Sequence, residues 1–72
     1  MYFNERECLR AMFDADIRTW KDLTKKSGVP ARTMYNVRIG ETVPTIDQCY
    51  AIADALKLDD YRFFRVFPRK DR

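Results

Sequence analysis

The sequence predicts an all-α fold, a compact bundle of about five short helices. Apolar residues recur at intervals of three and four along most of the chain, and no segment alternates as a half-buried strand does. Only two glycines and three prolines interrupt the 72 residues, so the connections between helices are expected to be brief. Helix-capping residues also precede several of the apolar segments. A chain of this length predicts one domain with a single small core.

The first predicted helix lies within residues 4–15. Asn4 is suited to cap it, and Glu7, three residues later, gives a capping-box pattern. The side chains expected on its buried face are Cys8, Leu9, Met12 and Phe13. The second predicted helix follows Thr19, with Asp22 in its first turn, and ends at Gly28, which can adopt the left-handed conformation that stops a helix.

The third predicted helix covers residues 31–39. Pro30 is suited to its start because the first turn needs no backbone N–H from that position, and Gly40 is suited to its end. Met34 and Val37 form its apolar face, so the other side of this helix is free to reach outward.

The last two predicted helices fill the remainder of the chain. Thr45 and Gln48 form another capping box. The apolar face that follows consists of Ile46, Cys49, Ile52, Ala53 and Leu56. A final helix is expected within residues 59–67, and a short basic tail, residues 69–72, is expected to fray.

The final helix carries more apolar side chains than one side of a short helix can bury. We therefore predict that it contacts a protein partner, either a second copy of this chain or another protein. The side chains predicted at this interface are Tyr61, Phe63, Phe64 and Phe67.

Composition argues against most other functions. The chain has no histidine, and its two cysteines, Cys8 and Cys49, are expected to be reduced core thiols, with a disulfide as the alternative. We therefore expect no metal, no cofactor, no small-molecule substrate and no catalysis. The charged N-terminus and the lack of a long apolar run predict a cytoplasmic protein without a membrane partner. A net charge of +3 suits a polyanionic partner without requiring one.

Two helices joined by a short turn that contains a glycine form a helix-turn-helix. At this point the sequence resembles the Cro/repressor-type (XRE-like) helix-turn-helix family, which includes small phage lysogeny-switch regulators. The resemblance extends from about Asn4 to Phe67 and rests on the joint spacing of a few elements. They are Leu23, Gly28-Val29, Met34, Val37, and Gly40 followed by Pro44-Thr45. It implies one lambda-repressor-like domain over residues 1–68, with the motif at about 20–39.

In that family the second motif helix lies in the DNA major groove. Carried over by position, the resemblance implies that Ala31, Arg32, Tyr35 and Asn36 face the bases. Arg32 can bond a guanine with two hydrogen bonds, and Asn36 can do the same with an adenine. The implied phosphate contacts are Thr19, Lys21, Thr33, Arg38 and Thr42. The implied partner is double-stranded DNA, bound by a homodimer.

The chain departs from the family pattern at several positions. Trp20 replaces a glutamine that touches phosphate, Thr24 replaces a small alanine, Pro30 replaces a Ser/Thr cap, and Arg38 stands where an acidic residue is common. The leading hypothesis is a sequence-specific transcription regulator of the Cro or repressor type. The alternative is a protein-binding modulator, of the antirepressor or antitoxin type, that forms a hetero-complex with a repressor or another protein.

Overall fold

The structure, a computed structural model, describes residues 2–69. Within that range it consists of helices and loops, without a strand. The helices are α1 (Glu5–Asp14), α2 (Trp20–Ser27), α3 (Ala31–Arg38), α4 (Ile46–Leu56) and α5 (Asp60–Val66). The predicted all-α class and the number of helices are confirmed. Of the predicted basic tail, Arg69 is exposed, and residues 70–72 lie outside the described residues.

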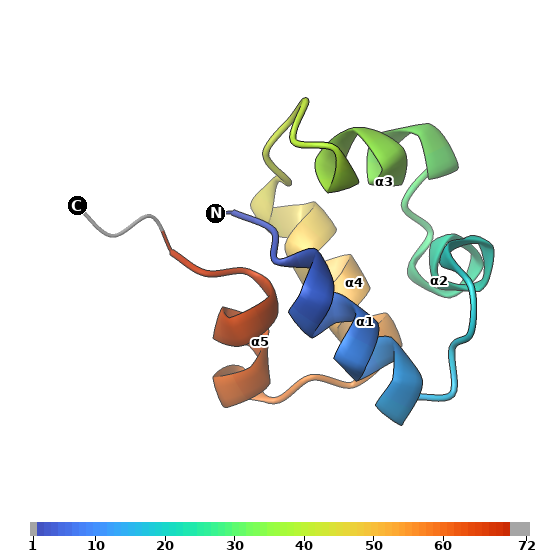
Figure 1. Cartoon of the computed structure of the whole chain (residues 1–72), viewed down its shortest axis with the longest axis vertical. Helices are drawn as coiled ribbons and strands as arrows, with labels where there is room; N and C mark the ends of the chain where they lie inside the picture. Colours follow the sequence, from blue (N-terminus) through green and yellow to red (C-terminus); the bar gives the residue numbers. More distant parts are fainter. Residues whose placement is uncertain (1, 70–72) are drawn as a thin grey trace.

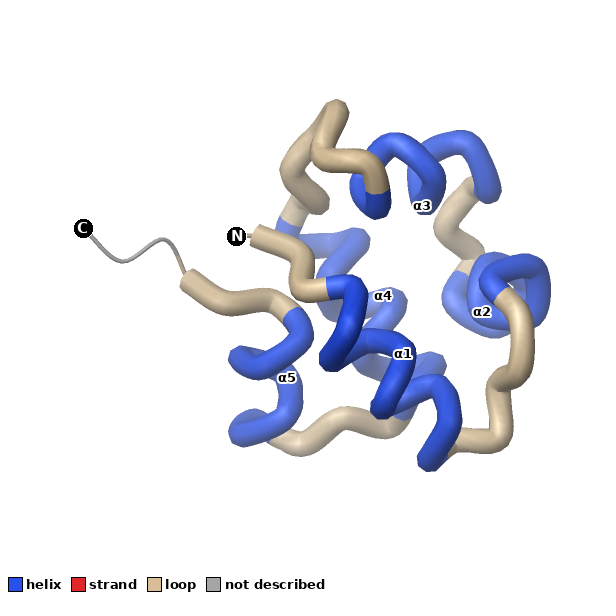
Figure 2. Tube along the Cα trace, in the orientation of Figure 1, coloured by secondary structure: helices blue, strands red, loops and turns tan. Residues whose placement is uncertain are grey.

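The helices are arranged around α1 and α4 (Figure 1). α5 packs on α1, α2 packs on α4, and α3 packs on α2 at one end of the molecule. The connections are short loops (Figure 2). No helix in residues 2–69 has the length and apolar character needed to cross a membrane.

Side-chain caps begin the helices where the sequence predicts them. The Asn4 side chain accepts a hydrogen bond from the Glu7 N–H, and the Thr19 hydroxyl accepts one from the Asp22 N–H. Thr45 and Gln48 form both bonds of a capping box, which confirms that prediction. At Asn4 only the bond from the Glu7 N–H is present, so the predicted box is incomplete there.

The buried face of α1 differs from the predicted one. Cys8 and Met12 are buried as expected, but Ala11 is buried where Leu9 and Phe13 were predicted to be. α1 therefore faces the core with the stripe at positions 8, 11 and 12. Leu9 and Phe13 are exposed instead.

A smaller correction concerns α4. Four of its five predicted core side chains are buried, but Ile46 is exposed because it is the first residue of the helix, at its open end.

The prediction that Phe63 and Phe67 face a partner is wrong. Both side chains are buried inside this single chain, with Phe67 at 0% exposure and Phe63 at 7%. The N-terminal segment folds back along the end of the chain, because the Asn4 N–H donates to the Val66 carbonyl at 2.8 Å. This places the ring of Phe3 over that of Phe67, with 5.8 Å between the ring centres. Only Tyr61 and Phe64 of the predicted interface remain exposed.

Both cysteines are free thiols buried in the core, as expected, and the alternative disulfide is not formed. Burial raises the pKa of Cys8 from its usual 9.0 to about 12. Burial is the largest cause of this rise, the negative charge of Glu5 contributes to it, and the positive charge of Arg38 opposes it.

The raised pKa of Cys8 predicts a loss of stability in alkali. A thiol whose pKa is higher in the folded state stabilises the fold fully below pH 9.0, and this contribution is lost as the pH rises toward 12. We expect the stability difference between the wild type and Cys8→Ala to narrow above pH 9.0. Urea unfolding at a series of pH values measures it, with the difference near neutral pH as the baseline. A difference that stays constant would contradict the buried neutral thiol.

Candidate nucleic-acid interface

The unit formed by α2 and α3 has the geometry of a helix-turn-helix. Gly28 ends α2 with φ at +78°, and its N–H donates to the Thr24 carbonyl at 2.9 Å. A side chain at that φ would strain the backbone, which explains the glycine. Val29, in the turn between the two helices, is buried in the core cluster. Figure 1 shows α2 almost end-on and α3 lengthwise, so the helices cross steeply.

The two sides of α3 differ in character. Met34 and Val37 are buried and attach the helix to the rest of the molecule. On the other side Ala31, Arg32 and Tyr35 are exposed, with Tyr35 at 57%. Arg32 forms no hydrogen bond or ion pair with residues 2–69, so its guanidinium is available to a ligand. Three of the four residues predicted to read bases therefore lie on one free surface.

Asn36, the fourth of these residues, is half-buried and also shapes the following loop. Its backbone carbonyl accepts hydrogen bonds from the N–H groups of Glu41 (2.9 Å) and Thr42 (3.3 Å). Gly40 turns the chain with φ at +83°, which makes this return possible. The loop thus holds Thr42, a predicted phosphate contact, in an exposed position next to the end of α3.

The remaining predicted phosphate contacts differ in their exposure. Thr19 and Lys21 are exposed at the start of α2, and Thr33 is half-buried in α3. Between the two helices lies a hollow of about 390 Å³. Its lining residues are Trp20, Lys21, Thr24, Ala31, Met34, Tyr35 and Arg38. Lys21 and Tyr35 therefore border the same hollow, one predicted to contact the phosphate backbone and the other a base.

Arg38 is half-buried and engaged by other side chains of the molecule, which argues against its predicted contact with phosphate. Its guanidinium lies over the Trp20 ring, 4.2 Å from the ring centre, and donates to Glu5 at 3.1 Å. The side chain is 29% exposed, and its Nε is buried without a hydrogen-bond partner among the described residues. The arrangement links α1, α2 and α3. We call Glu5, Trp20 and Arg38 the arginine clamp.

Sequence reasoning did not find the arginine clamp, because its members are far apart in the chain. The available signal was that Trp20 and Arg38 both depart from the pattern of the family that the chain resembles. The structure shows that the two departures are one contact, since the indole face receives the guanidinium.

The charge of this surface is modest. Its free cations are Lys21 and Arg32, and Asp22 and Glu41 lie nearby in sequence. Apart from Arg38, the other described cations lie away from the exposed side of α3. They are on α1 and the loop that follows it, at the ends of α2 and α4, and on α5 or just after α5. The shape of α3 and its free polar side chains, more than charge, therefore mark this surface.

The residues of the interface do not form a metal site. Within residues 2–69, no group of three or more histidine, cysteine or acidic side chains is arranged to hold a metal ion.

No family model matches the chain, and neither the curated proteins nor the solved structures provided a match. The resemblance to the Cro/repressor-type family therefore rests on the quoted residues.

Proposed function

We propose that this protein is a small sequence-specific DNA-binding transcription regulator that reads the major groove with α3. One observation carries the proposal: α3 is attached by Met34 and Val37, while Arg32 and Tyr35 project from its other side. An α-helix fits the major groove, where base edges present a distinct pattern for each base pair. A helix presented in this way at the end of a molecule is the arrangement that groove reading requires.

The side chains support particular roles. Arg32 can bond a guanine, Asn36 an adenine, and Ala31 can contact a thymine methyl group. Tyr35 can bond a phosphate or pack against a sugar. Lys21, at the start of α2, reaches the phosphate backbone beside the groove. All of these roles are binding roles, so the proposal includes neither catalysis nor a cofactor. The proposal also places the protein in the cytoplasm.

One domain of this size offers few contacts, so we propose a homodimer on a two-fold site. Two α3 helices would then occupy half-sites about 34 Å apart, one turn of DNA. The exposed Tyr61 and Phe64 offer a surface for the second copy. Bound in this way, the protein would block transcription by occupying the DNA, as the small phage regulators that it resembles do.

A second candidate function is that of a protein-binding modulator. The arginine clamp favours it, because Trp20 and Arg38 are engaged with each other and leave few free cations beside α3. In this case α2 and α3 would present the hollow between them to a repressor or to another protein partner.

Binding of the purified protein to DNA upstream of its own gene separates the two functions. The experiment measures affinity across a salt series, with a scrambled duplex as the control. The regulator is expected to prefer the native sequence and to lose affinity as salt rises, because phosphate contacts release counterions. Weak and equal binding to both duplexes would contradict it and favour the modulator.

A further inference from the structure

α1 presents an apolar surface to the outside of the molecule. Phe13 is 85% exposed, the highest value among the large apolar side chains of residues 2–69, and Leu9, one turn before it, is also exposed. Two such side chains on one helix indicate a surface that a partner covers. This surface lies on α1, whereas the candidate DNA-reading side chains lie on α3, the helix at the top of Figure 1.

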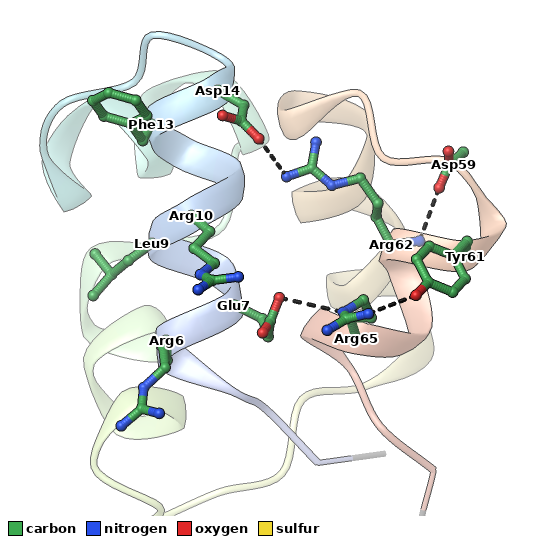
Figure 3. A pocket seen from close by; sticks show the side chains of 10 residues that line it. All are labelled: Arg6, Glu7, Leu9, Arg10, Phe13, Asp14, Asp59, Tyr61, Arg62 and Arg65. Carbon is green, nitrogen blue, oxygen red and sulfur yellow. Dashed lines mark hydrogen bonds and ion pairs between the residues drawn. The ribbon is translucent and has the colours of Figure 1, made fainter.

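A shallow groove runs between α1 and α5, and Leu9 and Phe13 line its edge on the side of α1 away from α5 (Figure 3). Its volume is about 910 Å³. The lining residues that matter here are Arg6, Leu9, Arg10 and Phe13 from α1, and Tyr61 and Arg65 from α5. A second hollow, of about 570 Å³, lies along Leu9 and Phe13 and reaches Ile17. Phe13 therefore borders two concave regions. We call the first of them the α1–α5 groove.

The acidic side chains of the α1–α5 groove already have partners. Glu7 is 3.5 Å from Arg65, and Asp14 accepts a hydrogen bond from Arg62 at 2.8 Å. Asp59 caps α5 by accepting from the Arg62 N–H. The ion pairs join α1 to α5, and each of these carboxylates is already engaged by a group of the chain itself (Figure 3).

Two cations of the groove are left without such partners. Arg6 and Arg10 form no ion pair or hydrogen bond with residues 2–69. They lie four positions apart on α1, so both guanidiniums project from the same side of the helix. The free charge of the groove is therefore positive and lies directly beside its apolar side chains.

We propose that the α1–α5 groove binds an acidic amphipathic helix of another protein. Apolar side chains of the partner would pack on Leu9 and Phe13, and its carboxylates would pair with Arg6 and Arg10. A groove between two helices accepts a third helix through spaced apolar anchors. The proposal is independent of DNA binding, since it uses no residue of α2 or α3.

Two other occupants of the groove need to be distinguished from an acidic helix. In a symmetric dimer both copies would present the same surface, so Arg6 and Arg10 would meet like charges while the acidic side chains remain engaged. An anionic membrane offers the same negative charge, and binding to lipid vesicles distinguishes it in the test below. Carboxylates on an apolar helix match the free arginines and the apolar side chains beside them.

A selection from displayed helical peptides tests the proposal. A peptide library with random surface positions is selected for binding to the full chain. Peptides that also bind the Arg6→Glu/Arg10→Glu variant are removed. We expect the enriched peptides to combine an apolar stripe with carboxylates one turn apart. Their synthetic forms should bind the wild type at least about tenfold more tightly than this variant or Phe13→Ser. The matched control, Lys25→Glu/Lys26→Glu, makes the same charge change outside the groove and should bind like the wild type.

Three outcomes would overturn the proposal. The first is that no acidic peptide is enriched, or that enriched peptides bind the groove variants and the wild type equally. The second is that sedimentation finds a wild-type dimer that Phe13→Ser dissociates, because the occupant would then be a second copy. The third is that vesicles of phosphatidylserine and phosphatidylcholine bind the wild type but not the groove variants while the peptides do not bind. Circular dichroism confirms that each variant is folded.

Discussion

Replacing Phe67 with alanine is expected to unfold most of the protein at room temperature. The side chain is fully buried, and its ring centre lies 5.3 Å from that of Phe63 and 5.8 Å from that of Phe3. Truncating a buried phenylalanine costs about 3–5 kcal/mol. A single core in a chain of this size supplies only about 3–5 kcal/mol of stability. The loss is therefore comparable to the whole free energy of unfolding.

Far-UV circular dichroism with a urea titration measures this loss. Phe64→Ala is the matched control, because it removes the same side chain three positions earlier, where it is 45% exposed. The control is expected to cost less than about 1 kcal/mol. If Phe67→Ala kept its fold and changed only the oligomeric state, the burial of Phe67 would be refuted and its interface role restored.

Replacing Arg32 with alanine is expected to remove most of the sequence preference in DNA binding. A bidentate contact to guanine contributes about 1–3 kcal/mol of discrimination, so affinity for the preferred duplex should fall about 10- to 100-fold for each chain bound. Affinity for the scrambled duplex should fall much less. Fluorescence anisotropy with both duplexes measures the two losses. Unchanged affinity and unchanged preference would show that Arg32 does not read bases.

Two companion variants separate phosphate contacts from internal ones. Lys21→Gln should weaken binding to both duplexes equally and reduce the log–log salt slope by about 0.9 for each chain bound. Arg38→Gln should lower affinity and stability without changing that slope, because its guanidinium is held by Glu5 and Trp20. An equal reduction of the slope in Arg38→Gln would restore its predicted role as a phosphate contact.

The beginnings and ends of the helices were predictable from the sequence because they depend on neighbouring residues. A cap such as Thr19 or Thr45 bonds to an N–H only three residues away. Gly28 ends α2 through its own backbone conformation. The exposed side of α3 was predictable for a similar reason, since Met34 and Val37 define the opposite side of the same helix.

The candidate DNA-reading residues follow from the resemblance to the helix-turn-helix family, but neither that resemblance nor the local pattern predicts the arginine clamp. Glu5, Trp20 and Arg38 lie in α1, α2 and α3, respectively. Nothing in their sequence positions indicates that they contact one another. From the sequence, Arg38 is expected to be a free cation at the end of a helix. Only the structure shows that it is engaged, because that depends on Glu5 of α1 lying next to the end of α3.

The sequence by itself therefore determined the helices, their caps, the glycine turn and the face of α3 that is buried. Only the tertiary structure decided which face of α1 is buried and that Phe67 belongs to the core. Helical periodicity allows two neighbouring apolar stripes on α1, and the fold buries the one that contains Ala11. Phe67 is buried because the segment with Phe3, far away in sequence, covers it. Burial depends on what lies against a side chain, which local sequence does not contain.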